Sequence, residues 1–425
     1  MTIAVFLSSL LGAMALGMPI AFALLVCGLA LMWHLDMFDT QILAQNLING
    51  ADNFPLLAVP FFILAGELMN AGGLSRRIID IAMALVGHVR GGLGYVAIFA
   101  AVVLASLSGS AVADTAALAA ILVPMMRNAG YDVNRSCGLI AAGGIIAPVI
   151  PPSIGFVIFG VAAGVSITKL FMAGIVPGLL MGASLVAAWA LVCGKEARPA
   201  APRASFLEAL KVIVNGFWAL LLPVIIIGGL KFGIYTPTEA AVVAAVYAWL
   251  VGAVVYRTIG WRELKACLIG AAKTSSIVMF LVAASMVASW LITVADLPGD
   301  VVRLLQPFID SRILLMVMMM VVVLVVGTAL DFVPTVLILT PVLMPIVHAA
   351  GIDPVYFGVL FIMNNAIGLL TPPVGTVLNV VCGVARAPMD GVIRGVTPFL
   401  VAEILIMFVM TVFPSLVTVP ASWFR

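Results

Sequence analysis

Long apolar stretches, separated by short polar segments, run through the whole chain. A helix needs about 20 apolar residues to cross the hydrocarbon core of a bilayer, and nine stretches meet this length. These predicted crossings are residues 2–33, 54–72, 136–165, 169–193, 213–232, 236–256, 269–294, 355–385 and 395–418. Only 9% of the residues are charged, against about a quarter in soluble domains, so the chain cannot cover a water-exposed surface. The sequence therefore predicts an all-α polytopic membrane protein.

The composition also excludes several classes of function. A net charge of +2 and the lack of a basic stretch with interleaved aromatic residues give no footprint for nucleic acid. No GxxxxGKS/T motif is present, so the chain does not hydrolyse ATP with a P-loop. The five cysteines are far apart and form no CxxC pair, so neither a disulfide framework nor a structural metal is expected. We interpret the first apolar stretch as a retained crossing and not a signal peptide, because no basic region precedes it.

Two further apolar stretches, residues 91–126 and 312–348, are interrupted midway by small polar residues. The interruptions are SLSGS in the first stretch and GTALD in the second. Each half has about 15 residues, or roughly 22 Å of helix, which is too short to cross. Irregular backbone at membrane depth is tolerated only where it is buried in protein or lines a cavity. We therefore expect two re-entrant hairpins, with candidate functional sites at their tips.

Basic residues are concentrated on one predicted side of the membrane. With a cytoplasmic N-terminus, nearly all Lys and Arg residues of the loops are cytoplasmic, and Asp36, Asp296 and Asp353 lie on the opposite face. Arg303 and Arg312 are the exceptions. This distribution agrees with the positive-inside rule, and it predicts a cytoplasmic N-terminus and an external C-terminus.

Three polar or amphipathic segments complete the predicted layout. Residues 195–212 form the one clearly polar, proline-containing stretch and are interpreted as a cytoplasmic linker. Residues 74–87 and 297–309 place charges on one face and apolar residues on the other. We expect both to be helices that lie along the membrane interface, or else ordinary loop helices without function.

The chain repeats itself at an offset of 221 residues. Four prolines recur at this offset, where composition alone predicts roughly half of one coincidence. The aligned prolines are Pro124 with Pro345, Pro151 with Pro372, Pro152 with Pro373, and Pro177 with Pro398. The crossing at 213–232 has no counterpart, so the second unit is inverted. Inverted repeats with discontinuous helices are the architecture of secondary transporters, whose sites lie near the midplane at the breaks.

The repeat divides the chain into three predicted parts. Residues 1–194 form the first repeat, with its hairpin at 91–126 and a broken helix at 136–165. Residues 195–235 contain the linker and the unpaired crossing. Residues 236–425 form the second, inverted repeat, with its hairpin at 312–348 and a broken helix at 355–385.

Each broken helix contains a pair of prolines, in GGIIAPVIPPSIG at 143–155 and in NNAIGLLTPPVG at 364–375. Proline removes a backbone donor and frees the carbonyl one turn back. Such oxygens suit a hard cation such as Na⁺, while the N-termini of half-helices present N–H groups to an anion. We expect coupling Na⁺ ions and no cofactor. The candidate ion ligands are Ser106, Ser108, Gly109, Ser110, Pro148, Pro151, Thr328, Asp331, Gly368, Thr371 and Thr376. The candidate substrate contacts are Ser110, Asp114, Ser153, Thr335, Asn364 and Asn365.

Charged residues within apolar stretches are rare and costly, at about 2.5–3.5 kcal/mol each on insertion scales. Asp114 is interpreted either as the counter-charge of a cation or as a cap of the returning half-helix. Glu239 follows Thr236 and Pro237 in a capping-box pattern, which gives it a structural role. Glu67 and Glu403 are interpreted as partners of polar groups in the protein interior, or as direct participants in transport.

Several strings resemble the large membrane subunit of tripartite ATP-independent periplasmic (TRAP) transporters. They are GMPIAFALL at 17–25, PFFILAGELMNAGG at 60–73, SGSAVADTAA at 108–117, IAPVIPPS at 146–153, GIYTPTEAAVVAAVYA at 233–248 and GLLTPPVG at 368–375. The likeness runs from end to end, and TPTEAA and TPPVG are its most specific strings. Within the family, the chain looks most similar to the subunit type associated with 2,3-diketo-L-gulonate.

The resemblance implies a sodium-driven elevator transporter in the bacterial inner membrane. Its implied partners are a periplasmic solute-binding protein and a small four-helix membrane subunit. Its implied substrates are carboxylates, often sugar acids, and the hairpins with the broken helices would form the mobile transport domain.

Two other functions are compatible with the membrane composition. A stand-alone ion-coupled carboxylate transporter would share the inverted architecture but take its substrate directly from solution. An integral membrane enzyme would need clustered histidines or paired carboxylates near one interface, and the scattered acids and three distant histidines do not provide them.

Overall fold

The computed structural model describes residues 2–193, 205–296, 311–372 and 374–422, together with Gly299 and Arg303. Throughout these ranges the regular structure is helical and no strand occurs. The helices at the start and in the middle of the chain, here called the outer helices, are α1 (Thr2–Ala15), α2 (Ile20–His34), α3 (Thr40–Ala51), η1 (Phe54–Leu57), α4 (Ala58–Ala71), α5 (Leu74–Val86), α11 (Phe206–Lys231), α12 (Pro237–Leu250), η2 (Val251–Val255) and α13 (Trp261–Val294).

The remaining helices are here called the repeat helices, followed by a short C-terminal helix. They are α6 (Gly92–Ser108), α7 (Ala111–Asn128), α8 (Val133–Gly144), α9 (Ile154–Ala163), α10 (Ile167–Val192), α15 (Arg312–Ala329), α16 (Phe332–Ala349), α17 (Pro354–Gly368), α18 (Thr376–Ala385) and α19 (Met389–Val412), and then α20 (Ser415–Ser422).

Eight helical segments of the described chain are long and apolar enough to cross a membrane. They are Phe54–Ala71, Ile167–Val192, Phe206–Lys231, Pro237–Val255, Trp261–Val294, Arg312–Ala329, Phe332–Ala349 and Met389–Val412. The prediction of an all-α, polytopic membrane protein is confirmed.

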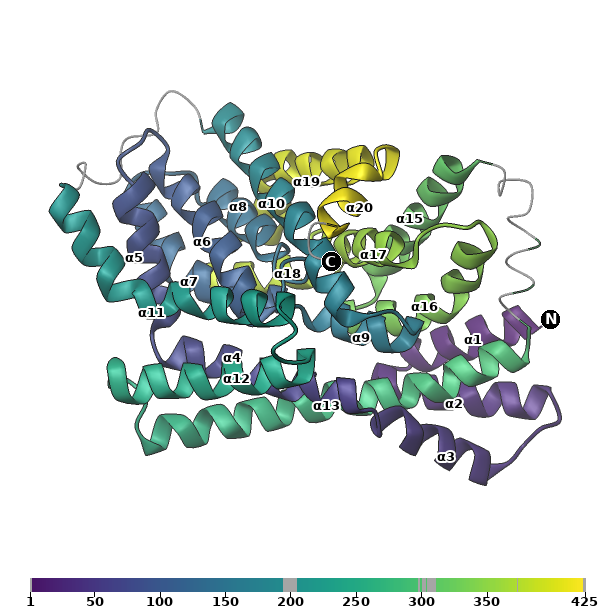
Figure 1. Ribbon diagram of the computed structural model, residues 1–425. Coiled ribbons are helices and arrows are strands. Elements are labelled where there is room, and N and C mark those ends of the chain that lie inside the picture. Colours follow the sequence, from purple (N-terminus) through teal and green to yellow (C-terminus); the bar gives the residue numbers. More distant parts are fainter. Residues whose placement is uncertain are drawn as a thin grey trace.

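The predicted single crossing at 2–33 is wrong. The chain there forms two helices, because Gly17 adopts a left-handed backbone with φ of +78° and Pro19 follows just before α2. The Cys27 thiol lies 3.6 Å from the carbonyl oxygen of Phe6, so α1 and α2 pack side by side as an antiparallel pair. The start of α1 and the end of α2 therefore lie at the same end of the molecule (Figure 1). This arrangement removes the basis for a cytoplasmic N-terminus, because it puts the start of α1 on the side of Asp36.

Three predicted bounds are also corrected. The arms of the second hairpin, α15 and α16, have 18 residues each and not about 15, so both are long enough to be candidate spans. The predicted crossing at 395–418 ends earlier, since α19 stops at Val412 and α20 follows a break at Phe413 and Pro414. The predicted linker 195–212 extends too far, because α11 begins at Phe206 behind a capping box of Ser205 and Glu208.

The amphipathic stretch at 74–87 forms α5, with its apolar side buried. Its predicted counterpart at 297–309 lies almost wholly outside the described residues, as does the part of the linker at 195–204. Pro373 of the second proline pair is also outside them.

The helix bounds recur at nearly the offset found in the sequence. Helices α7 and α16 begin at Ala111 and Phe332, and 332 − 111 = 221. Helices α8 and α17 begin at Val133 and Pro354, and 354 − 133 = 221. The packing is reciprocal as well, since α7 contacts α18 while the corresponding α16 contacts α9, and α8 contacts α19 while α17 contacts α10. Such exchange of equivalent contacts is expected of two units related by a pseudo-two-fold axis.

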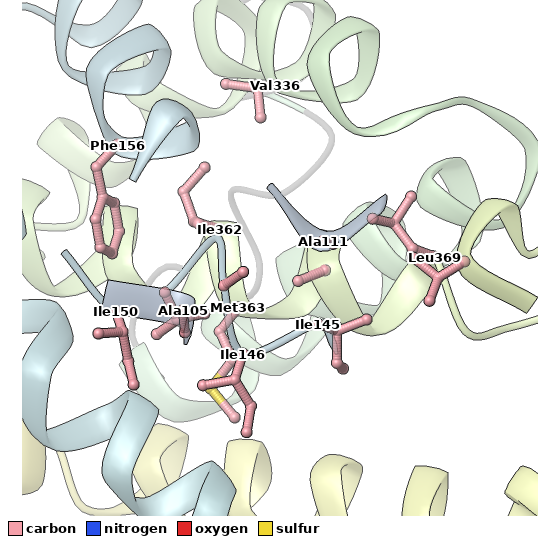
Figure 2. Packing of buried hydrophobic residues seen from close by; sticks show 14 of the residues in the cluster. Ala105, Ala111, Ile145, Ile146, Ile150, Phe156, Val336, Ile362, Met363 and Leu369 are labelled. Carbon is pink, nitrogen blue, oxygen red and sulfur yellow. The ribbon is translucent and has the colours of Figure 1, made fainter. Parts of the chain in front are cut away.

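The outer helices cover one side of the repeat helices. Helix α4 packs against both α12 and α13, and α13 continues along α2 and α3 (Figure 1). The centre of the molecule is a cluster of apolar side chains from both repeats. Ala105 and Ala111 of the first hairpin lie near Ile145 and Ile146 of the segment after α8, and Met363 of α17 joins them (Figure 2). The two hairpins and the two breaks are therefore packed into one core.

Candidate functional site

The first hairpin reverses at Gly109, which has φ of +62° and joins α6 to α7. The Ser110 hydroxyl accepts from the backbone N–H of Ala113 at 3.4 Å and caps the start of α7. The Ser108 hydroxyl donates to Asp114 Oδ1 at 2.5 Å and accepts from the backbone N–H of Ser110 at 3.1 Å. The tip is thus held by its own side chains, and Ser108 and Asp114 are both buried.

The first broken helix meets this tip directly. Helix α8 ends at Gly144, and α9 begins at Ile154 behind Ser153, whose hydroxyl donates to the carbonyl oxygen of Pro148. A Cβ atom at Gly109 would lie 2.5 Å from the carbonyl oxygen of Pro152. Because that distance leaves no room for a side chain, the backbone of the tip and the backbone of the break are in contact.

The second hairpin and the second break are related in the same way, but with different side chains. Asp331 caps α16 by accepting from the N–H of Phe332 at 2.8 Å, and Thr376 at the start of α18 lies 3.5 Å from the same carboxylate. The Asn365 side-chain amide donates to the carbonyl oxygen of Phe332 at 2.8 Å. Gly368 packs on the backbone of Gly327, at the end of α15.

A cavity of about 340 Å³ lies where the two tips, the two breaks and two outer helices meet. Its polar lining consists of Ser108 and Ser110 from the first tip, Asp331 from the second, Glu67 and Asn70 from α4, and Thr274 from α13. Pro148 and Leu369 of the two breaks complete the wall, with apolar residues such as Phe62 and Val278. The volume is within the range of small-molecule sites, about 300–1,000 Å³.

Of the predicted ion ligands, Ser108, Gly109, Ser110, Pro148 and Asp331 line this cavity. The others do not, and several of their hydroxyls are bonded to a backbone carbonyl oxygen three or four residues earlier in the chain. Ser106 donates to Val103, Thr328 donates to Val325, and Thr371 donates to Ile367. Pro151, Gly368 and Thr376 also lie outside the lining.

Of the predicted substrate contacts, only Ser110 lines the cavity. The remaining five, Asp114, Ser153, Thr335, Asn364 and Asn365, are buried behind its wall. Thr335 donates to the carbonyl oxygen of Asp331 at 2.9 Å, so it supports the second tip from inside.

The sequence reasoning missed Asn70 and Thr274, and it considered Glu67 only as one of several charges within apolar stretches. Glu67 and Asn70 are three residues apart on α4 and thus face the same side of the helix. The one signal in the sequence that could have identified this part of the site was the presence of an ionisable residue, Glu67, within a predicted crossing.

Behind the tips, four buried oxygens lack a hydrogen-bond partner within the described part of the chain. They are Asp114 Oδ2, Thr115 Oγ1, Asn364 Oδ1 and Asn365 Oδ1. Two belong to the first hairpin and two to the helix before the second break, which are not equivalent positions of the repeat. Thr115 of the first hairpin lies against Gly144 of α8, and Asn365 is the residue of the second repeat that corresponds to Gly144, since 365 − 144 = 221. Buried acceptor oxygens without a donor are a chemistry that suits a hard cation.

Comparison with known proteins identifies a protein family for this chain. Residues 7–416 match the family described as the tripartite ATP-independent periplasmic transporter, DctM component. The chain is 59% identical to the 2,3-diketo-L-gulonate TRAP transporter large permease protein YiaN of Escherichia coli, over all of both chains. It is 39% identical to the sialic acid TRAP transporter large permease protein SiaM of Vibrio cholerae, over 95% of each chain.

Among solved structures, the chain is similar in fold to the YdaH transporter of Alcanivorax borkumensis, a protein with an unusual topology. The TM-score is 0.60 at 16% sequence identity, and the match covers 87% of this chain and 86% of the other. This likeness concerns the fold alone.

Proposed function

Because the chain belongs to the family of the DctM component of tripartite ATP-independent periplasmic transporters, we propose that it takes up a small carboxylate or sugar acid by a sodium-driven elevator movement. It is a multi-pass protein of the bacterial inner membrane. Its relatives are permeases, and those named for a substrate include proteins for 2,3-diketo-L-gulonate, sialic acid and C4-dicarboxylates. A sugar acid or a dicarboxylate is therefore the proposed substrate class.

This proposal rests on the observation that both repeats contribute residues to the cavity. Ala111 and Phe332, the first residues of α7 and α16, both line it, so two helix N-termini face one space. Helix N-termini attract a carboxylate through their dipoles and through the N–H groups that remain beside their caps, which are Ser110 at α7 and Asp331 at α16. The polar groups of Asn70 and Thr274 are suited to the hydroxyl groups of a sugar acid.

The acidic residues in the cavity support a cation as co-substrate. Glu67 and Asp331 line the same space, and an anionic substrate beside two carboxylates is unfavourable without a positive charge between them. The unpartnered oxygens of Asp114, Asn364 and Asn365 behind the tips are suitable ligands for such ions. In this proposal Na⁺ binds first, neutralises the tips and lets the substrate bind.

The contact between the first tip and α4 supports an elevator. A Cβ atom at Gly66 would lie 3.5 Å from the Cβ atom of Ser108, so the outer helix presents bare backbone to the tip. A flat surface of this kind allows the tip to slide, whereas an interlocking side chain would hold it. The repeat helices would move together with the substrate, and α4, α12 and α13 would stay fixed in the membrane.

The proposed partners follow from the family: a periplasmic solute-binding protein that delivers the substrate, and a small four-helix membrane subunit. The test is uptake into liposomes that contain the chain and its small subunit. An inward Na⁺ gradient and a binding protein loaded with one labelled acid from a panel should together give uptake. Uptake without a binding protein would favour the stand-alone transporter, and uptake without Na⁺ would refute sodium coupling.

The movement is tested by distances between spin labels in a cysteine-free background. Labels at Ala120→Cys on the first hairpin and Ile277→Cys on α13 replace exposed side chains outside the cavity. Their distance should change between sodium-free and substrate-bound conditions. The control pair, Val246→Cys on α12 with Ile277→Cys, lies within the outer helices and should keep one distance. If both pairs stay constant while uptake proceeds, the elevator is refuted.

A further inference from the structure

A second polar cavity, of about 380 Å³, shares no residue with the first. It is lined by Arg76, Arg77 and Asp80 of α5, Asn215 of α11 and Tyr256 after η2. These three segments meet at one end of the molecule, where α5 packs against α11 (Figure 1).

One of the two arginines is held rigidly in this cavity. The guanidinium carbon of Arg77 lies 3.5 Å from the centre of the Tyr256 ring, which is a cation–π contact. Arg77 Nη1 also donates to the carbonyl oxygen of Gly73 at 3.0 Å. The Tyr256 hydroxyl in turn donates to the carbonyl oxygen of Asn215 at 3.0 Å. The cationic wall is thus preorganised by contacts between α5, α11 and the end of η2.

The second arginine is available to a ligand. Arg76 is exposed, and it makes no hydrogen bond or ion pair with any residue that the structure describes. The lining carries two positive charges and one negative charge, from Asp80, so its formal net charge is +1. A singly charged anion matches this lining better than a dianion does.

The cavity lies at the ends of two candidate spans, so we place it at the depth of the lipid headgroups. Two candidate spans end beside it, one at Ala71 just before α5 and one at Val255 just before Tyr256. Arg257, Arg262 and Lys265 follow Tyr256 in the chain, so this is the basic face that the positive-inside rule places in the cytoplasm. Apolar side chains continue from the cavity along α11, where Phe217 and Trp218 are 50% and 39% exposed.

We propose that this cavity binds the phosphate diester of an anionic phospholipid in the cytoplasmic leaflet. The guanidinium fork matches the geometry of a phosphate, and a phosphodiester carries the single negative charge that the lining requires. A lipid is favoured over a free phosphate ion because the acyl chains can lie along the exposed apolar side chains of α11. Bound there, the lipid ties α5 to α11 and braces the outer helices at the membrane surface.

The test is lipid binding to the delipidated protein in detergent, measured by native mass spectrometry. Phosphatidylglycerol should bind in preference to phosphatidylcholine, and Arg76→Gln should weaken phosphatidylglycerol binding about five- to tenfold without changing phosphatidylcholine binding. Arg76→Lys should keep part of the preference. Arg262→Gln is the matched control, since Arg262 lies at the same face but does not line the cavity.

Three outcomes would overturn the proposal. Equal binding of the two lipids would show that the cavity does not select an anion. An equal loss in Arg262→Gln would show that diffuse surface charge is responsible. Displacement of phosphatidylglycerol by inorganic phosphate, with the same dependence on Arg76, would assign the cavity to a soluble anion and not to a lipid.

Discussion

Replacement of Gly109 by alanine is the sharpest test of the contact between the first hairpin tip and the first broken helix. We expect this substitution to have two free-energy costs. Gly109 has φ of +62°, and an L residue in this left-handed region costs about 1–2 kcal/mol more than glycine. The new Cβ atom would also lie 2.5 Å from the carbonyl oxygen of Pro152, whereas a relaxed C···O contact is about 3.3–3.6 Å.

The second cost can be isolated because the chain offers a matched glycine. Gly130 has φ of +81°, and a Cβ atom there meets nothing within 4 Å. Gly130→Ala therefore carries the backbone cost alone. Gly109→Ala must in addition move the tip about 1 Å away from the break, and overpacking of this kind costs about 1–3 kcal/mol. This difference corresponds to about a 5- to 150-fold loss in the population of the native tip.

The assay compares both variants in two measurements. Sodium should raise the unfolding temperature of the parent protein and of Gly130→Ala, because an ion that binds only the folded tip stabilises it. That sodium effect should be much smaller in Gly109→Ala, and the Na⁺ concentration for half-maximal uptake should rise. If the two alanine variants respond equally to Na⁺, the contact between tip and break is not part of the ion site, and our reasoning is wrong.

Three further predictions concern other parts of the molecule. Ser108→Ala should raise the Na⁺ concentration for half-maximal uptake, because Ser108 lines the cavity and its hydroxyl bonds Asp114. Thr328→Ala should not, because Thr328 lies outside the lining and its hydroxyl bonds the carbonyl oxygen of Val325. Equal effects on Na⁺ dependence would contradict this distinction. Glu403→Gln should leave the unfolding temperature unchanged or raise it, because the buried carboxylate has no hydrogen-bond partner in the described part of the chain. A marked fall in the unfolding temperature would show that this carboxylate does have a stabilising partner. Single cysteines in place of Thr2 and Asp36 should react with an impermeant reagent from the same side of the membrane, because α1 and α2 are antiparallel; labelling from opposite sides would restore the single crossing.

The sequence determined the places where the helices break, because those breaks depend on local chemistry. Gly109 supplies the left-handed turn of the first tip, and Asp331 supplies the N-cap of the second. The proline pair at Pro151 and Pro152 interrupts the helix between α8 and α9. The membrane class followed equally directly from the apolar stretches, since length and hydrophobicity alone decide whether a helix can cross.

The same local signals failed at the short turn between α1 and α2. Gly17 and Pro19 lie within an unbroken apolar stretch, so hydrophobicity favoured one crossing although the turn residues were visible. The predicted cytoplasmic location of the N-terminus depended on counting residues 2–33 as one crossing.

Only the tertiary structure decided which polar groups share the cavity. Ser108 and Thr328 have similar positions before the two tips, but Ser108 lines the cavity, whereas Thr328 does not and its hydroxyl is bonded to the carbonyl oxygen of Val325. The orientation of a side chain around its helix depends on how that helix packs, and no local pattern encodes it. Glu67 and Thr274 reach the tips from helices about 200 residues apart in sequence, because α4 and α13 pack against each other beside the hairpins. A site assembled across such distances follows from the packing of preformed helices, so the tip residues could be predicted from the sequence, but their association with Glu67 and Thr274 could not.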